Sequence, residues 1–208
     1  MRHATLKLGG EWGDCVGEID RHGVVFFWGG SGNGKTSAVV SFCKELTRYG
    51  QVLYISLEEK YSLSIQDTLR RFGMQECGKR FQLLDSFSFE DLEERLCKQR
   101  SPEFIVIDSF QYTRMSYKDY IRFKERWSNK LLIFVSHAAG RQPAGKPAIA
   151  VMYDAMLKIW VEGHVAMSKG RFMGPTQKAV IWRHGAELYW GTGDFGEGEL
   201  VRKSEKQK

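Results

Sequence analysis

Short apolar runs alternate with longer amphipathic segments over most of the chain. Five runs are rich in β-branched and aromatic residues: 24–28, 52–56, 81–85, 104–108 and 131–136. The intervening segments, such as 34–50 and 64–73, space their apolar residues as a helix does and end at a glycine suited to a helix C-cap. This alternation predicts an α/β fold with a mostly parallel central sheet flanked by helices.

The pattern changes after about residue 156. Short segments punctuated by glycine follow one another without helix-length spacers: 157–163, 164–170, 178–185 and 186–191. They predict C-terminal antiparallel β-hairpins appended to the parallel sheet. No linker or repeat interrupts the chain, so we expect residues 1–200 to form a single domain, followed by a charged, flexible tail at 201–208.

Composition limits the class of protein. The chain has 208 residues, of which 42% are hydrophobic, enough for one globular domain with a sizeable core. Its net charge of +6 is compatible with a polyanionic partner and equally with simple surface solvation. The four cysteines are widely spaced, which predicts reduced thiols and no zinc site. Because the chain lacks a signal peptide and an apolar run of about 18 residues, we expect a cytoplasmic protein with no membrane partner.

The clearest chemical motif begins where the first apolar run ends. Residues 29–36 match G-x-x-x-x-G-K-[ST], after an expected strand and before an expected helix. Such a loop points successive backbone N–H groups at a phosphate, and the helix N-terminus adds a favourable dipole. We expect Lys35 to neutralise the β and γ phosphates and the Thr36 hydroxyl to bind Mg²⁺. The residues expected to bind the nucleotide are Gly29, Gly30, Ser31, Gly32, Asn33, Gly34, Lys35, Thr36 and Ser37.

Carboxylates follow two of the other expected strands. Asp108 ends an apolar run, so we expect it at the carboxyl end of a buried parallel strand beside the phosphate loop, where it would help Thr36 to organise Mg²⁺. Glu58 and Glu59 follow another run, and one of them is expected to orient the attacking water. Glu58 is preferred as the catalytic base, and Glu59 remains the alternative. A turn or a helix cap would also account for these carboxylates.

These segments together resemble the RecA-like P-loop ATPases, in particular RadA and the DnaB-type replicative helicases. The resemblance rests on the phosphate loop followed by VLYISLEE, FIVIDSFQ, FVSH and SKGRFMGP, and it spans about residues 5–190. It implies a RecA-like fold that binds ATP and Mg²⁺, with Glu58 as base and Asp108 as the metal-organising carboxylate. It also implies that His137 senses the γ-phosphate, and that Gln111 corresponds to a glutamine of RadA.

The same resemblance implies a homo-oligomer, either a ring or a filament. Lys169 and Arg171 resemble the basic pair of the K-x-R-F motif in RadA and of the related K-x-R motif in DnaB-type helicases, which reaches the nucleotide of a neighbouring subunit. A guanidinium suits this role because it can contact two γ-phosphate oxygens at once. Met173 before Gly174 departs from the family spacing. It therefore stays open which of the two basic residues would reach the neighbouring nucleotide.

Two segments are candidates for contact with single-stranded DNA. Arg114 and Lys118 follow the Asp108 strand, and Arg141 and Lys146 follow the His137 strand, where RecA-like proteins place mobile DNA-contacting loops. Cations close to aromatic side chains suit phosphate backbones and stacked bases. Short loops with two cations are, however, equally common on ordinary surfaces.

Three functions are compatible with these features. The leading hypothesis is Mg-dependent ATP hydrolysis coupled to binding or translocation of single-stranded DNA, in replication, recombination or repair. The alternative is a KaiC-like regulatory switch, in which ATP controls assembly with a protein partner. A P-loop kinase for a small metabolite is least favoured, because the basic pair and the polar sensor count against it.

Overall fold

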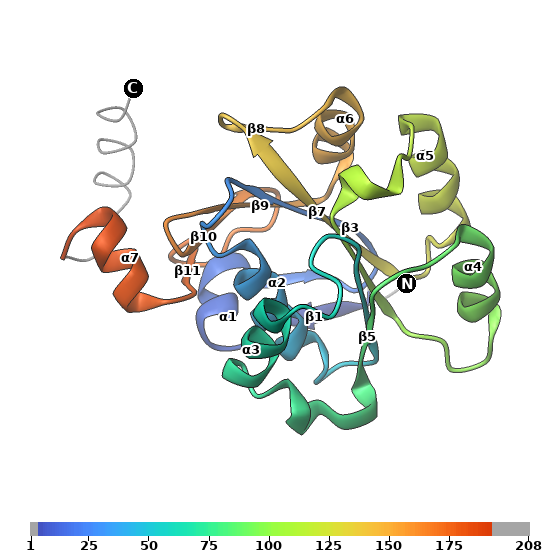
Figure 1. Cartoon of the computed structure of the whole chain (residues 1–208), viewed down its shortest axis with the longest axis horizontal. Helices are drawn as coiled ribbons and strands as arrows, with labels where there is room; N and C mark the ends of the chain where they lie inside the picture. The colour runs from blue at the N-terminus through green and yellow to red at the C-terminus, as the bar shows by residue number, and fades with distance from the viewer. Residues whose placement is uncertain (1–3, 193–208) are drawn as a thin grey trace.

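A large sheet runs through the centre of the molecule, with helices on both faces (Figure 1). The computed structural model describes residues 4–192. The strands of this sheet are β3 (Gly23–Gly29), β4 (Val52–Ser56), β5 (Phe81–Leu84), β6 (Phe104–Asp108), β7 (Leu131–Ala139), β8 (Gln142–Pro143), β9 (Leu157–Glu162), β10 (Val165–Gly170) and β11 (Lys178–Val180). Their order is β11-β10-β9-β3-β7-β6-β4-β5, and β8 pairs with β7. The six strands from β9 to β5 are mutually parallel, which confirms the predicted sheet.

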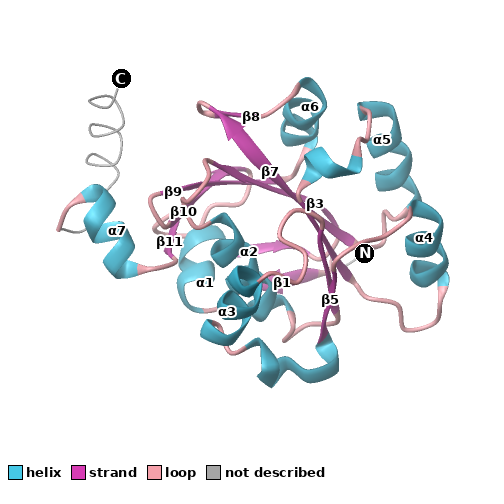
Figure 2. Cartoon of the chain, viewed as in Figure 1, coloured by secondary structure: helices cyan, strands magenta, loops and turns pink. Residues whose placement is uncertain are grey.

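Two helical layers cover the sheet (Figure 2). The helices are α1 (Gly10–Val16), α2 (Lys35–Leu46), α3 (Leu63–Arg71), α4 (Phe89–Cys97), α5 (Tyr117–Arg126), α6 (Lys146–Asp154) and α7 (Arg183–Trp190), with short 3₁₀ helices η1 (Met74–Arg80) and η2 (Phe110–Thr113). In β3, Val25 and Phe27 share a core with α1, α2 and α3, whereas Phe26 and Trp28 share one with α4, α5 and α6. Successive strand residues point to opposite faces, so burial of both faces explains the continuous apolar runs of the sequence.

The strand order determines which residues meet at the carboxyl edge of the sheet. The sequence predicts a strand end beside the phosphate loop for Asp108, but β7 lies between β3 and β6. Gly29 is paired with His137, and Asp108 is paired with Val135. The end of β7 therefore reaches the edge between the phosphate loop and Asp108.

The C-terminal region confirms part of the predicted hairpin pattern. β9 and β10 form a hairpin, and β11 pairs antiparallel with β10. The prediction of a further strand segment at 186–191 is wrong, because α7 occupies most of it. Ala186 and Trp190 are buried one helical turn apart while Leu188 and Tyr189 are exposed, so tertiary packing overrides the β preference of the aromatic residues. The predicted tail at 201–208 lies outside the described residues.

A small N-terminal unit packs beneath α2 and was not evident from the sequence pattern. β1 (Thr5–Lys7) and β2 (Glu18–Asp20) form a separate two-stranded sheet, and α1 connects them. Trp12 of α1 packs edge-on against Phe27 and Phe42, and its indole N–H donates to Ser41 Oγ at 3.0 Å. All four cysteines are free thiols. Within residues 4–192, no helix is long and apolar enough to cross a membrane.

Candidate functional site

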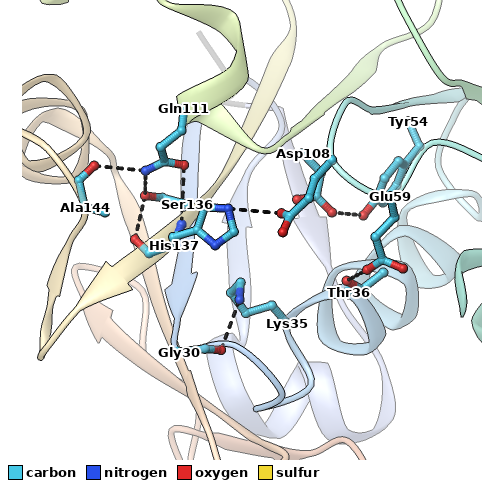
Figure 3. A network of polar contacts seen from close by, with 11 residues as sticks. Gly30, Lys35, Thr36, Tyr54, Glu59, Asp108, Gln111, Ser136, His137 and Ala144 are labelled. Carbon is cyan, nitrogen blue, oxygen red and sulfur yellow. Dashed lines mark hydrogen bonds and ion pairs between the residues drawn. The ribbon is translucent and has the colours of Figure 1, made fainter.

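The phosphate loop connects the end of β3 to the start of α2. Gly34 precedes the helix in a left-handed conformation, with φ of 87°, and a Cβ there would lie 2.9 Å from His164 Nδ1. A Cβ on Gly29 would lie 2.2 Å from the carbonyl oxygen of Val161. Both positions therefore require glycine, one for its backbone conformation and one for close packing. Lys35 Nζ donates to the Gly30 carbonyl at 3.0 Å across the loop (Figure 3).

A cavity of about 330 Å³ adjoins the loop. It is lined by Ser31, Gly32, Gly34, Lys35, Thr36, Ser37, Glu58, Glu59, Ser64, Thr68, Arg71, Asp108, His164 and Trp182. Gly29, Gly30 and Asn33 do not line it. Asn33 instead binds the β9–β10 turn. Its Oδ1 accepts a hydrogen bond from Gly163 N at 2.8 Å, and its carbonyl accepts one from His164 N at 3.1 Å.

A larger groove of about 820 Å³ lies against α4, η2 and α5. Its lining mixes apolar side chains with the acidic Glu93, Asp119 and Glu125 and with several arginines, and it includes no part of the phosphate loop. We therefore assign the candidate nucleotide site to the smaller cavity, where backbone N–H groups and a lysine converge.

Oxygen atoms suited to Mg²⁺ gather around Thr36. Its hydroxyl donates to Glu59 Oε1 at 2.7 Å, and Glu59 Oε2 is buried without a hydrogen-bond partner. Asp108 lines the same cavity and accepts a hydrogen bond from the Tyr54 hydroxyl (Figure 3). No cluster of three or more metal-binding His, Cys, Asp or Glu side chains occurs within residues 4–192. This donor set fits Mg²⁺, which takes one or two carboxylates and completes its shell with phosphate oxygens and water.

Burial and mutual repulsion perturb the charges of this site. Burial raises the pKa of Asp108 to about 6; the Tyr54 hydrogen bond opposes this rise, and the charges of Glu58 and Glu59 add to it. Burial lowers the pKa of Lys35, against the opposing influence of Glu58, Asp108 and Glu59. Three carboxylates thus act on one lysine at this site.

The two adjacent glutamates make different contacts. Glu58 Oε2 lies 3.2 Å from Nε2 of His137, at the end of β7, whereas Glu59 contacts Thr36. The Glu58 and His137 side chains are about one third exposed, at 35% and 31%. The structure therefore brings the expected base next to the expected sensor and places Glu59 with the expected metal ligand.

Gln111 connects this edge to the next segments of the chain (Figure 3). Its amide nitrogen donates to Ser136 Oγ at 2.7 Å and to the Ala144 carbonyl at 2.9 Å, and its Oε1 accepts from His137 N at 3.4 Å. The side chain thereby links η2 to β7 and to the segment before α6. Gln111 therefore connects the backbone at His137 with η2 and with Ala144.

The basic pair lies away from the cavity of its own chain. Lys169 is near the end of β10, directly opposite Lys158 of β9, and Arg171 follows the strand. β10 runs antiparallel to β9, so Lys169 and Arg171 lie toward the edge of the sheet opposite the phosphate loop. Both residues are exposed, and neither lines the cavity.

Two of the four candidate DNA contacts lie on helices, and the other two lie in turns. Arg114 is the turn residue after η2, and Lys118 lies in the first turn of α5, which begins with a capping box at Ser116. Arg141 lies in the turn of the β7–β8 hairpin, and Lys146 begins α6. All four residues are exposed, and none lines the cavity.

Five residues of the cavity lining were missed by the sequence analysis. Ser64, Thr68 and Arg71 come from α3, His164 comes from the β9–β10 turn, and Trp182 is the residue before α7. None belongs to a motif, because each reaches the loop only through tertiary packing. The glycine-histidine turn between two expected strands was the available signal, since it pointed to a tight hairpin.

Comparison with known proteins identifies the fold. No protein-family model and no curated protein matches the chain. Among solved structures, it is similar to the KaiC-like protein PH0186 from Pyrococcus horikoshii OT3, with 17% identity, a TM-score of 0.57, and coverage of 83% of this chain and 88% of that chain. It is also similar to the flagellar accessory protein FlaH from Methanocaldococcus jannaschii, with 13% identity, a TM-score of 0.57, and coverage of 84% and 90%. These comparisons show no particular closeness to RadA or DnaB-type helicases; they establish that the chain has the RecA-like P-loop fold.

Proposed function

We propose that the chain binds ATP with Mg²⁺ at the phosphate loop and hydrolyses it. The observation that carries this proposal is the meeting of the loop with Glu58, Glu59 and Asp108 at one cavity. Backbone N–H groups of the loop and Lys35 hold the β and γ phosphates. Bound Mg²⁺ supplies charge stabilisation between these phosphates, and Thr36, Glu59 and Asp108 are the residues that would hold it.

Glu58 is the residue best suited to act as general base. The Glu59 side chain accepts a hydrogen bond from Thr36, whereas the Glu58 side chain is partly exposed and lies against His137. In this role Glu58 orients the water and accepts its proton, and His137 holds the carboxylate toward the γ-phosphate. The contact between Glu58 and His137 thus places the proposed base next to the proposed γ-phosphate sensor.

The active form is proposed to be a homo-oligomer in which Lys169 and Arg171 act on the nucleotide of a neighbouring subunit. Their distance from their own cavity along the sheet supports this arrangement, because a basic pair there is unable to serve its own phosphate loop. A cation supplied from a neighbour makes hydrolysis depend on assembly.

Hydrolysis has two candidate outputs. Coupling to single-stranded DNA is favoured by the exposed Tyr112 and Tyr117 beside Arg114 and Lys118, a combination suited to stacked bases and phosphates. Control of protein assembly is favoured by the structural neighbours, since their names describe a KaiC-like protein and a flagellar accessory protein. The Gln111 network gives either output a connection to the γ-phosphate end of the site.

Steady-state ATP hydrolysis tests the proposal. Lys35→Ala is expected to lower kcat/KM by about a hundredfold or more, because a charge that stabilises the transition state is lost. Lys44→Ala is the matched control: this lysine lies on the same helix and forms an exposed ion pair with Glu76, so activity should not change. Equal activity in wild type and Lys35→Ala would reject the assignment.

The two outputs are separated by repeating the assay with single-stranded DNA and by measuring mass with a nonhydrolysable ATP analogue. Stimulation by DNA that is lost in Arg114→Ala and Lys118→Ala supports the DNA-coupled function. Assembly that responds to nucleotide while DNA leaves the rate unchanged supports the regulatory switch.

A further inference from the structure

One aromatic side chain in the candidate nucleotide cavity has no role in the function proposed above. Trp182 is 46% exposed, whereas the other five tryptophans of the chain are 8% exposed or less. The fold buries the other five indoles, so the exposure of Trp182 is an exception within this chain. An indole left half open against a polar cavity therefore points to contact with a ligand.

The position of Trp182 is fixed although one side of its ring is uncovered. The His164 ring meets it edge-on, with centroids 4.9 Å apart, and a Cβ on Gly185 would lie 2.3 Å from the indole Cε3. Ile181 N donates to the His164 carbonyl at 2.9 Å, and His164 N donates to the Asn33 carbonyl at 3.1 Å. These contacts fasten the segment that carries Trp182 to the phosphate loop, so the ring needs little ordering when a ligand arrives.

The charged groups indicate which part of the cavity would hold the γ-phosphate and which part the nucleoside. The three carboxylates gather around Lys35 and Thr36, which identifies this part as the place of the γ-phosphate and Mg²⁺. Arg71 instead donates to Ser37 Oγ at 2.8 Å, one residue further along α2. Burial and the charge of Arg71 lower the pKa of His164, so this imidazole is neutral at pH 7 and behaves as an aromatic surface. A triphosphate with its γ-phosphate at the carboxylates extends its nucleoside toward Arg71, His164 and Trp182.

We propose that Trp182, backed by His164, is the surface on which the base of the bound nucleotide stacks, and that Arg71 contacts the phosphate next to the ribose. This inference rests on the proposed function and specifies its substrate class as a purine nucleoside triphosphate. A two-ring base covers more of the indole than a pyrimidine does, and stacking strength follows the overlapping area.

Equilibrium binding with Mg²⁺ present tests the inference with three ligands: ATP, UTP and inorganic tripolyphosphate, which has no base. Wild-type protein should bind ATP more tightly than UTP. Trp182→Ala should weaken ATP binding roughly tenfold, within the range of base stacking, and remove the preference over UTP. Trp182→Phe should retain most of the affinity and preference. Tyr153→Ala is the control, because this exposed aromatic residue of α6 lies outside the cavity and should have no effect.

Tripolyphosphate separates a lost stacking surface from a damaged fold. Its affinity should be unchanged in Trp182→Ala and lowered in Arg71→Ala, because of these two residues Arg71 alone is proposed to contact phosphate. Equal ATP affinity in wild type and Trp182→Ala would overturn this inference and leave the proposed function intact. Failure of the wild-type protein to bind either ATP or tripolyphosphate would overturn both.

Discussion

Asp108 combines an unfavourable environment with a proposed chemical role. The side chain is buried, and burial together with its acidic neighbours raises its pKa to about 6 despite the hydrogen bond from Tyr54. The folded protein therefore binds more protons than the unfolded chain between about pH 4 and 6, the ordinary and the raised pKa values. Stability contributed by this residue is present at low pH and falls as pH rises through this window.

A neutral side chain at this position should stabilise the protein and inactivate it. In EDTA at pH 8, we expect Asp108→Asn to raise the free energy of unfolding by about 1–3 kcal/mol, because each unit of pKa difference corresponds to about 1.4 kcal/mol. The Asn side chain can still accept from Tyr54. Urea denaturation measures the change, and the gain should shrink at pH 4, where the wild-type carboxyl is largely protonated as well.

Asp154 provides the control for this experiment. Hydrogen bonds from Lys124 and Tyr120 outweigh the effect of burial and lower the pKa of Asp154. Asp154→Asn should therefore destabilise the protein at pH 8. If Asp108→Asn also destabilised the protein, the unfavourable burial of the ionised Asp108 carboxylate would be disproved.

The two neighbouring glutamates should differ in kinetics. We expect Glu58→Gln to lower kcat by about a hundredfold or more with little change in ATP affinity, as for loss of a general base. Glu59→Gln should instead raise the Mg²⁺ concentration needed for half-maximal rate, because Glu59 contacts Thr36. Initial rates over a Mg²⁺ series distinguish the variants, and an exchange of the two phenotypes would reverse the assignment.

At the scale of elements, the β9–β10 turn joins the phosphate loop to α7. Gly163 has a φ of 52°, and a Cβ there would lie 2.3 Å from Tyr189 and 2.5 Å from Trp190 of the helix. The Gly163 N–H donates a hydrogen bond to Asn33 Oδ1 of the phosphate loop. Close packing at this one glycine therefore positions both α7 and the segment carrying Trp182.

Substitution of this glycine should separate crowding from backbone strain. We expect Gly163→Ala to lower the free energy of unfolding by about 2–4 kcal/mol, from the left-handed conformation and from overpacking together. Gly140→Ala is the matched control, because its φ is 62° and a Cβ there would have no neighbour within 4 Å. It should cost only about 1 kcal/mol. Equal losses in urea denaturation would show that α7 is not packed on the turn.

Some helices and strands could be predicted from the sequence, and others could not. Four of the five predicted parallel strands, β3, β4, β6 and β7, have continuous apolar runs because both of their faces are buried. The fifth, β5, lies at the edge of the sheet and is only partly buried. α7 was missed because its aromatic residues favour strands in isolation, while burial of Ala186 and Trp190 favours a helix here. The insertion of β7 between β3 and β6 is a pairing over long sequence separation, which no local pattern encodes.

At the scale of the whole molecule, the candidate site is incomplete within one chain if Lys169 and Arg171 act as proposed. They lie on the hairpin side of the sheet and do not line their own cavity. The phosphate loop and Asp108 could be predicted because each belongs to a short continuous segment, the motif at 29–36 and the apolar run at 104–108. Arg71, His164 and Trp182 were not, because they come from three segments that are distant in the sequence and meet at the cavity only in the folded chain.

Mixed subunits test the contribution of a neighbour. We expect two single variants to be nearly inactive. Lys35→Ala lacks the lysine that holds the phosphates, and Arg171→Ala lacks the cation proposed to act on the neighbouring nucleotide. Mixing them should restore part of the hydrolysis, because some interfaces then combine an intact loop from one chain with an intact Arg171 from the other. Full activity of Arg171→Ala alone, or no recovery on mixing, would contradict action between subunits.

The most direct test of the central claim is calorimetric titration of the protein with ATP and Mg²⁺. Wild-type protein should bind one nucleotide per chain, and Lys35→Ala should bind at least roughly tenfold more weakly, because a hydrogen bond to a charged phosphate is lost. Omission of Mg²⁺ should weaken binding to the wild type as well. Absence of ATP binding by the wild-type protein, or equal affinity in the Lys35→Ala variant, would contradict the account.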